Sequence, residues 1–419
     1  MRMMLGLINR FKKDDKGTTA VLFAICLMAV LGSVALSIDF GAWAKKRSDL
    51  SSSADFGSLA GARALVEAVL RKDDDNAEAI ARQTAVTFVS ENNGADAAAN
   101  VTASATRPYG VTVALNEYGK QYFSKAVGAS APDIDVVSHA VANRVADACV
   151  VALDPAAEPG IQFGLSGSVV ATGCSIWSNA EPANSMDGQG SGRVSSDYNC
   201  AVGGGSTTSS FNITPSVRSN CLKVRDPFAD WTAPDYSSQP CTANNMRING
   251  QVGSTLSPGR YCGGITIMGG ATVHFLPGEY IIDGGELIAK GSSSLSGTNV
   301  CFLFTNGANV DLSGTADVDL SACTSGPMED MIFAAGRDEP RVTSILSGNN
   351  LFRLEGHVYL PSHDLRYSGG PDGGFPADYT TIAAATIRFD GSSRVEFRNK
   401  SGGSDNYSGR AFSHIFLTQ

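Results

Sequence analysis

The chain has 419 residues, of which 32 are basic and 41 acidic, so its formal net charge is −9. This acidic balance argues against nucleic acid as a partner. Glycine is unusually frequent, at 46 residues, but it follows no three-residue period and prolines number only 16, which excludes a collagen-like chain. A chain of this length predicts about two or three domains.

The first feature in chain order is an uncharged, proline-free apolar segment at residues 18–38. As a helix it would be about 31 Å long, close to the ~30 Å hydrocarbon core of a bilayer. Five basic and two acidic residues precede it within residues 1–16. The positive-inside rule therefore predicts a cytoplasmic tail (1–17), one transmembrane helix in a bacterial inner membrane and a periplasmic remainder.

A cleaved signal peptide is the main alternative for this segment. Its apolar core would run only about 7–15 residues, and residues 35–37 make a poor cleavage site. An uncleaved anchor is favoured, which makes the lipid bilayer a partner of the chain.

Residues 39–150 predict a helical stalk followed by a small α+β domain. Apolar and small residues recur at helical steps after the span, which predicts one helix over about 18–70. Helices are also expected at 75–90 and 117–127, and strands at 101–106, 110–115 and 133–150. Gly57 and Gly61 form a GxxxG pattern, either for packing inside the domain or for assembly with another copy through the stalk helix.

The stretch 10–65 resembles the N-terminal region of TadE/TadG-like proteins of the Tad (tight adherence, Flp) pilus assembly system. The matching features are Gly17 before the apolar span, Asp39 and Gly41 directly after it, and Asp55 in an alanine-rich stretch. The resemblance covers about residues 10–150. It implies a pilin-like N-terminal region and a role in pilus assembly through contacts with other proteins of the machinery.

Two departures refine this resemblance. Pseudopilin members carry a glutamate five residues after the glycine, where this chain has Leu22, so the resemblance implies a retained anchor, as in the TadG-like branch. Residues 49–53 match the D-x-S-x-S string of the metal site in some TadG-like proteins. That string lies here in a charged helical stretch rather than after a buried strand, so we expect no metal and no other cofactor.

The pattern changes after residue 150 to short strands separated by glycine, asparagine or aspartate. Residues 151–246 read as a Gly/Ser-rich transition with early β coils, and residues 247–419 as an all-β domain. A loose V-x-apolar-x-G unit recurs, for example at 265–269 and 310–314. This pattern predicts a right-handed parallel β-helix with glycines at the corners.

Eight of the nine cysteines follow the span, an even number that suggests disulfides in an oxidising compartment. Most of their spacings are near the ~20–25 residues of one β-helix coil, and stacked strands lie about 4.8 Å apart, within reach of a disulfide. The predicted pairs are Cys301–Cys323 and Cys149–Cys174. No C-x-x-C pair occurs, so zinc is not expected.

The sequence contains few residue patterns that are typical of a catalytic site. Asp311, Asp317 and Asp319 could in principle act in catalysis or Ca²⁺ binding, but their polar surroundings favour a solvated surface. The chain contains no GxSxG and no P-loop. We therefore expect a non-enzymatic envelope component. The alternatives are an anchored carbohydrate-active or carbohydrate-binding β-helix protein and an adhesin.

Overall fold

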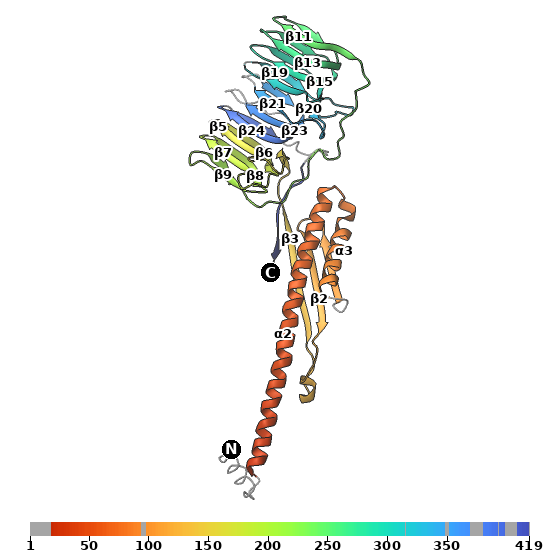
Figure 1. Ribbon diagram of the computed structural model, residues 1–419, viewed down its shortest axis with the longest axis vertical. Coiled ribbons are helices and arrows are strands. Elements are labelled where there is room, and N and C mark those ends of the chain that lie inside the picture. The colour runs from red at the N-terminus through yellow and green to blue at the C-terminus, as the bar shows by residue number, and fades with distance from the viewer. Residues whose placement is uncertain are drawn as a thin grey trace, which may run out of the picture. The chain divides into compact units, whose positions relative to one another are not determined.

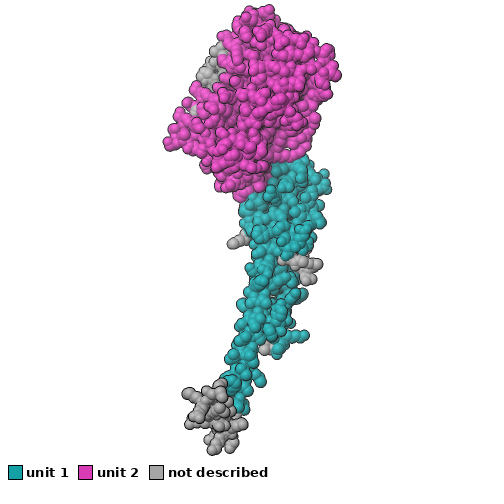
Figure 2. Space-filling view, viewed as in Figure 1, with its two compact units in different colours: residues 1–142, 415–419 teal, residues 143–414 magenta. Residues whose placement is uncertain are grey.

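The computed structural model describes residues 18–93, 98–314, 316–347, 352–368, 380–392, 394–398 and 409–418. The chain divides into two compact units, residues 1–142 with 415–419 (unit 1) and residues 143–414 (unit 2), which Figure 2 colours separately. Unit 2 is therefore inserted into unit 1 between strands β3 (Asp133–Arg144) and β26 (Phe412–Thr418).

Unit 1 is built on the single helix α2 (Thr18–Leu70), 53 residues long, as the sequence predicts (Figure 1). Its apolar part has an 18-residue window with a mean hydropathy of 2.6, none of which is buried, so it could cross a membrane. Beyond this part, α2 packs against helix α3 (Asp74–Asn93) and the sheet. The residues buried at this contact are mainly alanine, leucine and valine, which allow the helices to approach closely.

The sheet of unit 1 has four strands in the order β1-β2-β3-β26. Strands β1 (Ala98–Ser104), β2 (Tyr109–Tyr118) and β3 pair antiparallel. Alternate residues of β3 are buried from Ile134 to Ala142, as expected for a sheet with one face against a helix. The helix predicted at 117–127 is wrong. Only the short 3₁₀ helix η1 (Ser124–Val127) forms, and β2 runs to Tyr118.

Unit 2 is a parallel β-solenoid, which confirms the parallel stacking predicted from the sequence. Five strands form one sheet, namely β12 (Ser254–Leu256), β14 (Thr272–Phe275), β16 (Ser294–Gly297), β19 (Asp317–Ser321) and β22 (Phe352–Glu355). The other sheet has 17 strands. They are β4 (Ala148–Ala152), β5 (Ile161–Leu165), β6 (Ser168–Ser178), β7 (Met186–Gly190), β8 (Arg193–Ala201), β9 (Gly205–Thr207), β10 (Asn212–Thr214), β11 (Cys241–Asn249), β13 (Gly259–Met268), β15 (Gly278–Ala289), β17 (Val300–Thr305), β18 (Asn309–Leu312), β20 (Met331–Ala335), β21 (Val342–Ser347), β23 (His357–Ser368), β24 (Ile382–Gly391) and β25 (Arg394–Arg398).

Stacked side chains and glycine corners hold successive coils together. The rings of Tyr261, Tyr280, Phe302 and Phe333 follow one another through four coils, with centroids 6.0, 5.3 and 5.6 Å apart. At one corner Gly264 has φ +87°, and a Cβ there would lie 2.3 Å from the carbonyl oxygen of Glu286. Only glycine fits this position, because the conformation is left-handed and the next coil is in contact.

The order of the coils in space differs from their order in the chain. The stack begins at β11 and continues through β13, β15 and later strands to β24, which pairs with β4 and β5. From there it continues to β9 and β10. Residues 151–246, predicted as a Gly/Ser-rich transition with early β coils, contain strands β5 to β10 at one end of the solenoid.

Residues 221–240 lead back from that end to β11, and we call them the strap. The strap lies along the solenoid and hydrogen-bonds to one coil after another. In strap order these bonds join Trp177 Nε1 to the Leu222 carbonyl (3.1 Å), Asn179 Nδ2 to the Val224 carbonyl (2.8 Å), the Tyr359 hydroxyl to Asp226 (2.7 Å), Trp231 Nε1 to the Pro327 carbonyl (2.8 Å) and Arg260 Nη1 to the Gln239 carbonyl (2.7 Å). Phe228 and Trp231 of the strap are buried in a second hydrophobic cluster outside the main core.

Four disulfides join residues 21 to 25 positions apart, about one coil each. They are Cys149–Cys174, Cys200–Cys221, Cys241–Cys262 and Cys301–Cys323, so both predicted pairs are present. Two of them fix the strap. Cys221 attaches its first residue to β8, and Cys241, directly after its last residue, is joined to β13.

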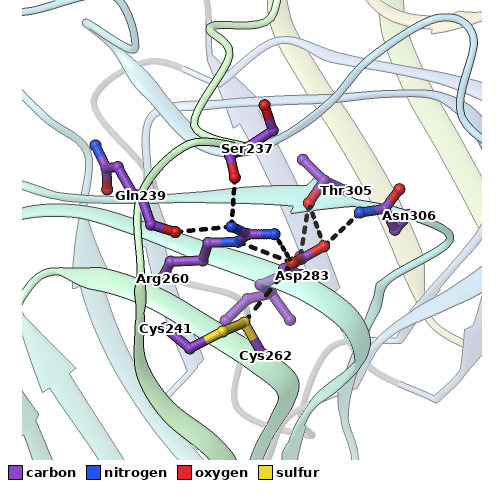
Figure 3. The surroundings of a disulfide bond; sticks show 9 residues. Ser237, Gln239, Cys241, Arg260, Cys262, Asp283, Thr305 and Asn306 are labelled. Carbon is purple, nitrogen blue, oxygen red and sulfur yellow. Dashed lines mark hydrogen bonds and ion pairs between the residues drawn. A yellow bond between two sulfur atoms is a disulfide. The ribbon is translucent and has the colours of Figure 1, made fainter.

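A polar cluster lies beside the disulfide at the β11 end (Figure 3). The Asp283 carboxylate accepts hydrogen bonds from Arg260 Nε (2.8 Å) and Asn306 Nδ2 (2.5 Å), which come from the coils on either side. Burial alone would raise the pKa of Asp283, but these bonds and the charge of Arg260 hold it below its usual range. Arg260 also donates to the carbonyls of Ser237 and Gln239, so this polar cluster joins three coils to the strap.

We predict that replacing Cys241 and Cys262 together with serine will lower the free energy of unfolding of unit 2 by about 3 kcal/mol, because a loop of this length gains about that much from closure. Denaturant unfolding of the detergent-solubilised protein measures the effect. Cys26→Ser, at an exposed free cysteine in the apolar part of α2, is the control and should leave stability unchanged. Equal stability of the double variant and the control would contradict the role of the strap attachment.

Acid should destabilise unit 2 through His363. This side chain is 1% exposed, its Nδ1 lies 2.8 Å from the Ser344 hydroxyl, and burial lowers its pKa from 6.5 to about 4. The contribution of His363 to the free energy of unfolding is complete above pH 6.5 and is lost as the pH falls towards 4. We expect a loss of about 3 kcal/mol over that range. Stability curves of His363→Asn should lack this loss, whereas the exposed-site control His274→Asn should retain it.

Candidate functional site

The carboxylate of Asp39 joins the start of the extramembrane part of α2 to a distant loop. Its side chain is fully buried, and Oδ2 accepts a hydrogen bond from the backbone N–H of Ser124 at 2.7 Å. The N–H groups of Tyr122 and Phe123 also donate to the carboxylate, at 3.1 Å. These are the free N–H groups at the start of η1, where the N-cap residue Phe123 provides no side-chain cap. Asp39 therefore caps η1 from another element.

The charge of Asp39 suits this position. Burial by itself would raise the pKa of the carboxyl, but hydrogen bonds from the hydroxyl and backbone N–H of Ser124, and from the N–H groups of Phe123 and Tyr122, hold it below the usual range. The carboxylate is therefore ionised at neutral pH. Charge-assisted hydrogen bonds of this kind are stronger than those between neutral groups.

Two more residues on the same face of α2 extend this contact. Trp43 Nε1 donates to the Lys120 carbonyl at 2.8 Å, and Lys46 Nζ lies 2.8 Å from the Glu117 carboxylate. With Asp39 they follow the i, i+4, i+7 spacing of one helix face. We call Asp39, Trp43, Lys46 and the segment 117–124 that they hold the membrane-proximal clamp.

The loop sequence permits this close approach. A Cβ at Gly119 would lie 2.7 Å from the ring of Trp43, so any larger residue would displace either the loop or the indole. Sequence analysis identified Asp39 by resemblance but missed Trp43, Lys46 and Glu117. The helical spacing of the first two from Asp39 was the available signal.

Gly57 and Gly61 lie inside unit 1. A Cβ at Gly57 would be 2.7 Å from Val89 Cγ2, and one at Gly61 would be 3.0 Å from both the Ala81 carbonyl oxygen and the Ala85 Cβ. Both glycines therefore allow α3 to pack closely against α2. This corresponds to the intramolecular interpretation of the GxxxG pattern.

The other residues of the resemblance have less defined roles. Gly41 is exposed, and among the described residues no atom beyond its neighbours lies within 4 Å of a Cβ built there. Asp55 is partly exposed, and its carbonyl accepts a bond from the Ser58 hydroxyl at 2.9 Å. Gly17 lies outside the described residues.

The three candidate aspartates of unit 2 do not converge. Asp311 is on β18 and pairs with Lys290 Nζ at 2.5 Å, whereas Asp317 and Asp319 are on β19 of the other sheet. Within the described ranges, no group of three or more His, Cys, Asp or Glu side chains could hold a metal ion. The clamp is therefore the site that the family motif and the geometry both indicate.

Loss of the Asp39 carboxylate should release the loop. We predict that Asp39→Ala will make the peptide bonds after Lys120 and Lys125 more susceptible to trypsin and will lower the stability of unit 1, because the N–H groups of Tyr122, Phe123 and Ser124 lose a charged acceptor. Limited proteolysis and thermal unfolding measure the two effects. The matched control is Asp49→Ala, at an exposed acid on the same helix. Cleavage rates equal to those of the control would show that the clamp does not hold the loop.

The glycines of α2 provide a second matched comparison. Gly61→Val should destabilise unit 1 by about 1–3 kcal/mol, because the added atoms overlap α3 and β2. Gly41→Ala has open space and should be neutral or stabilising by up to about 1 kcal/mol, since alanine favours helix. Thermal unfolding compares the two variants. A larger loss for Gly41→Ala would contradict the assignment of Gly61 to the internal contact.

The comparisons with known proteins bear on the same segment. The family described as "Putative Flp pilus-assembly TadE/G-like" matches residues 17–64, which contain the apolar part of α2, the α2 residues of the clamp and both GxxxG glycines. The match is shorter than the predicted resemblance over about 10–150. No curated protein and no solved structure gives a significant match to the chain. Residues 17–64, nearly all of them in the N-terminal helix, are thus similar to the TadE/G-like family of pilus-assembly proteins.

Proposed function

We propose that the chain is a membrane-anchored structural component of a Tad (Flp) pilus or its secretion machinery, acting through protein–protein contacts in the periplasm. The observation that carries this proposal is the continuity of α2. One helix contains the family match, an exposed apolar part long enough to span a bilayer, and the residues that hold the rest of unit 1.

This continuity suits an assembly role. A helix that runs unbroken from the bilayer into a folded unit transmits the position of the anchor to that unit. The clamp adds a second connection close to the end of the apolar segment, so the sheet of unit 1 cannot pivot freely about α2. Neither element requires a catalytic step or a cofactor, and the proposal includes none.

The proposed orientation places the tail before the span in the cytoplasm and both units in the periplasm of a single-pass inner-membrane protein. The basic residues before the span support this orientation. The four disulfides support it as well, because disulfides persist in oxidising compartments. The proposed partners are the lipid bilayer and other proteins of the pilus machinery. Contacts between copies through α2 would use faces other than Gly57 and Gly61, which pack against α3.

Deletion of the gene tests the proposal. We expect the deletion strain to lose surface pili and adherence, and the wild-type chain to restore both. Asp39→Ala should restore them poorly at equal protein level, and Asp49→Ala should restore them fully. Normal pili and adherence after deletion would refute the role. A reporter fused after Gln419 that is active only in the periplasm checks the orientation separately.

A further inference from the structure

We infer that the loop held by the clamp is a second membrane contact, which inserts the rings of Tyr118, Tyr122 and Phe123 into the interfacial layer of the bilayer that holds α2. We call residues 118–125 the interfacial loop. This inference rests on the membrane anchoring in the proposed function. It adds a lipid-binding surface outside the transmembrane segment.

The loop exposes large aromatic side chains. Tyr118, Tyr122 and Phe123 are 71, 62 and 49% exposed, and Phe40 on the adjacent turn of α2 is 69% exposed. All four belong to a short stretch of unit 1 around Asp39. Tyrosine combines an apolar ring with a polar hydroxyl, which is why it is enriched at the membrane–water interface. An exposed aromatic cluster is costly in water, but it is favourable at that interface.

The clamp determines the depth of the loop. Asp39 is the first residue after the apolar segment 18–38, and it binds the N–H groups of Tyr122 and Phe123 directly. These two residues therefore lie at the level where α2 leaves the hydrocarbon. In Figure 1 the loop, coloured ochre, lies beside α2 at the end of the unit 1 sheet that is nearest the apolar half of the helix. The bilayer around α2 is thus the surface that meets these rings.

The charges around the loop fit phospholipid headgroups. Lys120 and Lys125 of the loop, and Lys45 and Arg47 of α2, are exposed cations. Of the neighbouring acids, Glu117 pairs with Lys46, and the buried Asp39 carboxylate accepts three backbone N–H groups. Asp49 and Asp133 are exposed nearby, so the four exposed cations outnumber these two exposed acids. Cations beside an aromatic cluster favour the phosphates of the headgroup layer.

A second contact would have a mechanical consequence. A lone transmembrane helix can tilt and rotate in the bilayer, and interfacial aromatic and basic residues limit both motions. The interfacial loop contacts the bilayer beside α2, and the clamp prevents the loop from moving relative to the helix. The loop would therefore fix the tilt and the rotational orientation of unit 1 relative to the membrane surface.

Tryptophan fluorescence with brominated phospholipids tests the inference on the full chain in vesicles. Three single variants are compared with the wild type, whose three native tryptophans provide the background. Phe123→Trp probes the loop, and Phe23→Trp probes the apolar segment. Phe56→Trp is the water-exposed control, because it lies on α2 roughly 26 Å beyond Asp39. All three phenylalanines are at least 49% exposed, so the substitutions should not disturb packing.

We expect brominated lipid to quench the added fluorescence of Phe123→Trp and Phe23→Trp but not that of Phe56→Trp. Quenching of Phe23→Trp without quenching of Phe123→Trp would overturn the inference and leave the anchor intact. It would also be the result if the loop were reserved for a partner protein, because the vesicles contain only lipid. Absence of quenching for Phe23→Trp would refute the anchoring itself. Adding Asp39→Ala to Phe123→Trp should reduce its quenching.

Discussion

The arrangement of unit 1 depends on one buried charge, the carboxylate of Asp39. An ionised group in this position is unfavourable unless its oxygens are hydrogen-bonded, and the start of η1 supplies three N–H groups that otherwise lack an acceptor. The carboxylate and these N–H groups satisfy each other's hydrogen-bonding capacity, so breaking the contact would leave both without a partner. Because Asp39 directly follows the apolar segment, this interaction also determines where the sheet of unit 1 begins relative to the bilayer. Trp43 and Lys46, further along α2, add their own contacts with the same segment.

The constraint on unit 2 is its chain connectivity, because its coils are not stacked in chain order. The pairing of β24 with β4 joins strands far apart in the chain, and the strap must return along the whole stack to make this possible. An extended segment without ladder partners would be easily displaced. It is held by buried aromatic residues, by Arg260 and Asp226, and by a disulfide at each end. The disulfides therefore stabilise the topology rather than only adjacent strands.

Local patterns predicted much of this structure. The apolar segment, the long helix and the coil-length spacing of Cys149–Cys174 and Cys301–Cys323 all depend on residues close in sequence. The sequence alone could not predict that the strap runs back along the solenoid, because this course depends on the pairing of the distant strands β24 and β4. The helix predicted at 117–127 failed for a similar reason. The N–H groups of Tyr122, Phe123 and Ser124 are bound by the carboxylate of Asp39, more than 80 residues earlier in the chain, and Gly119 packs against Trp43. Resemblance identified Asp39 as a motif residue without showing what it binds.

The insertion of unit 2 into unit 1 constrains how the protein can fold. Strand β26 completes the unit 1 sheet next to β3, yet the whole solenoid lies between them in the chain. With the proposed orientation, the chain leaves the membrane from α2 onward, so unit 1 would hold only α2, α3 and three strands while unit 2 is exported. The clamp needs none of the later residues, because Asp39, Trp43 and segment 117–124 are all present by then. It could therefore secure unit 1 at the membrane before β26 arrives to cover the open edge of β3.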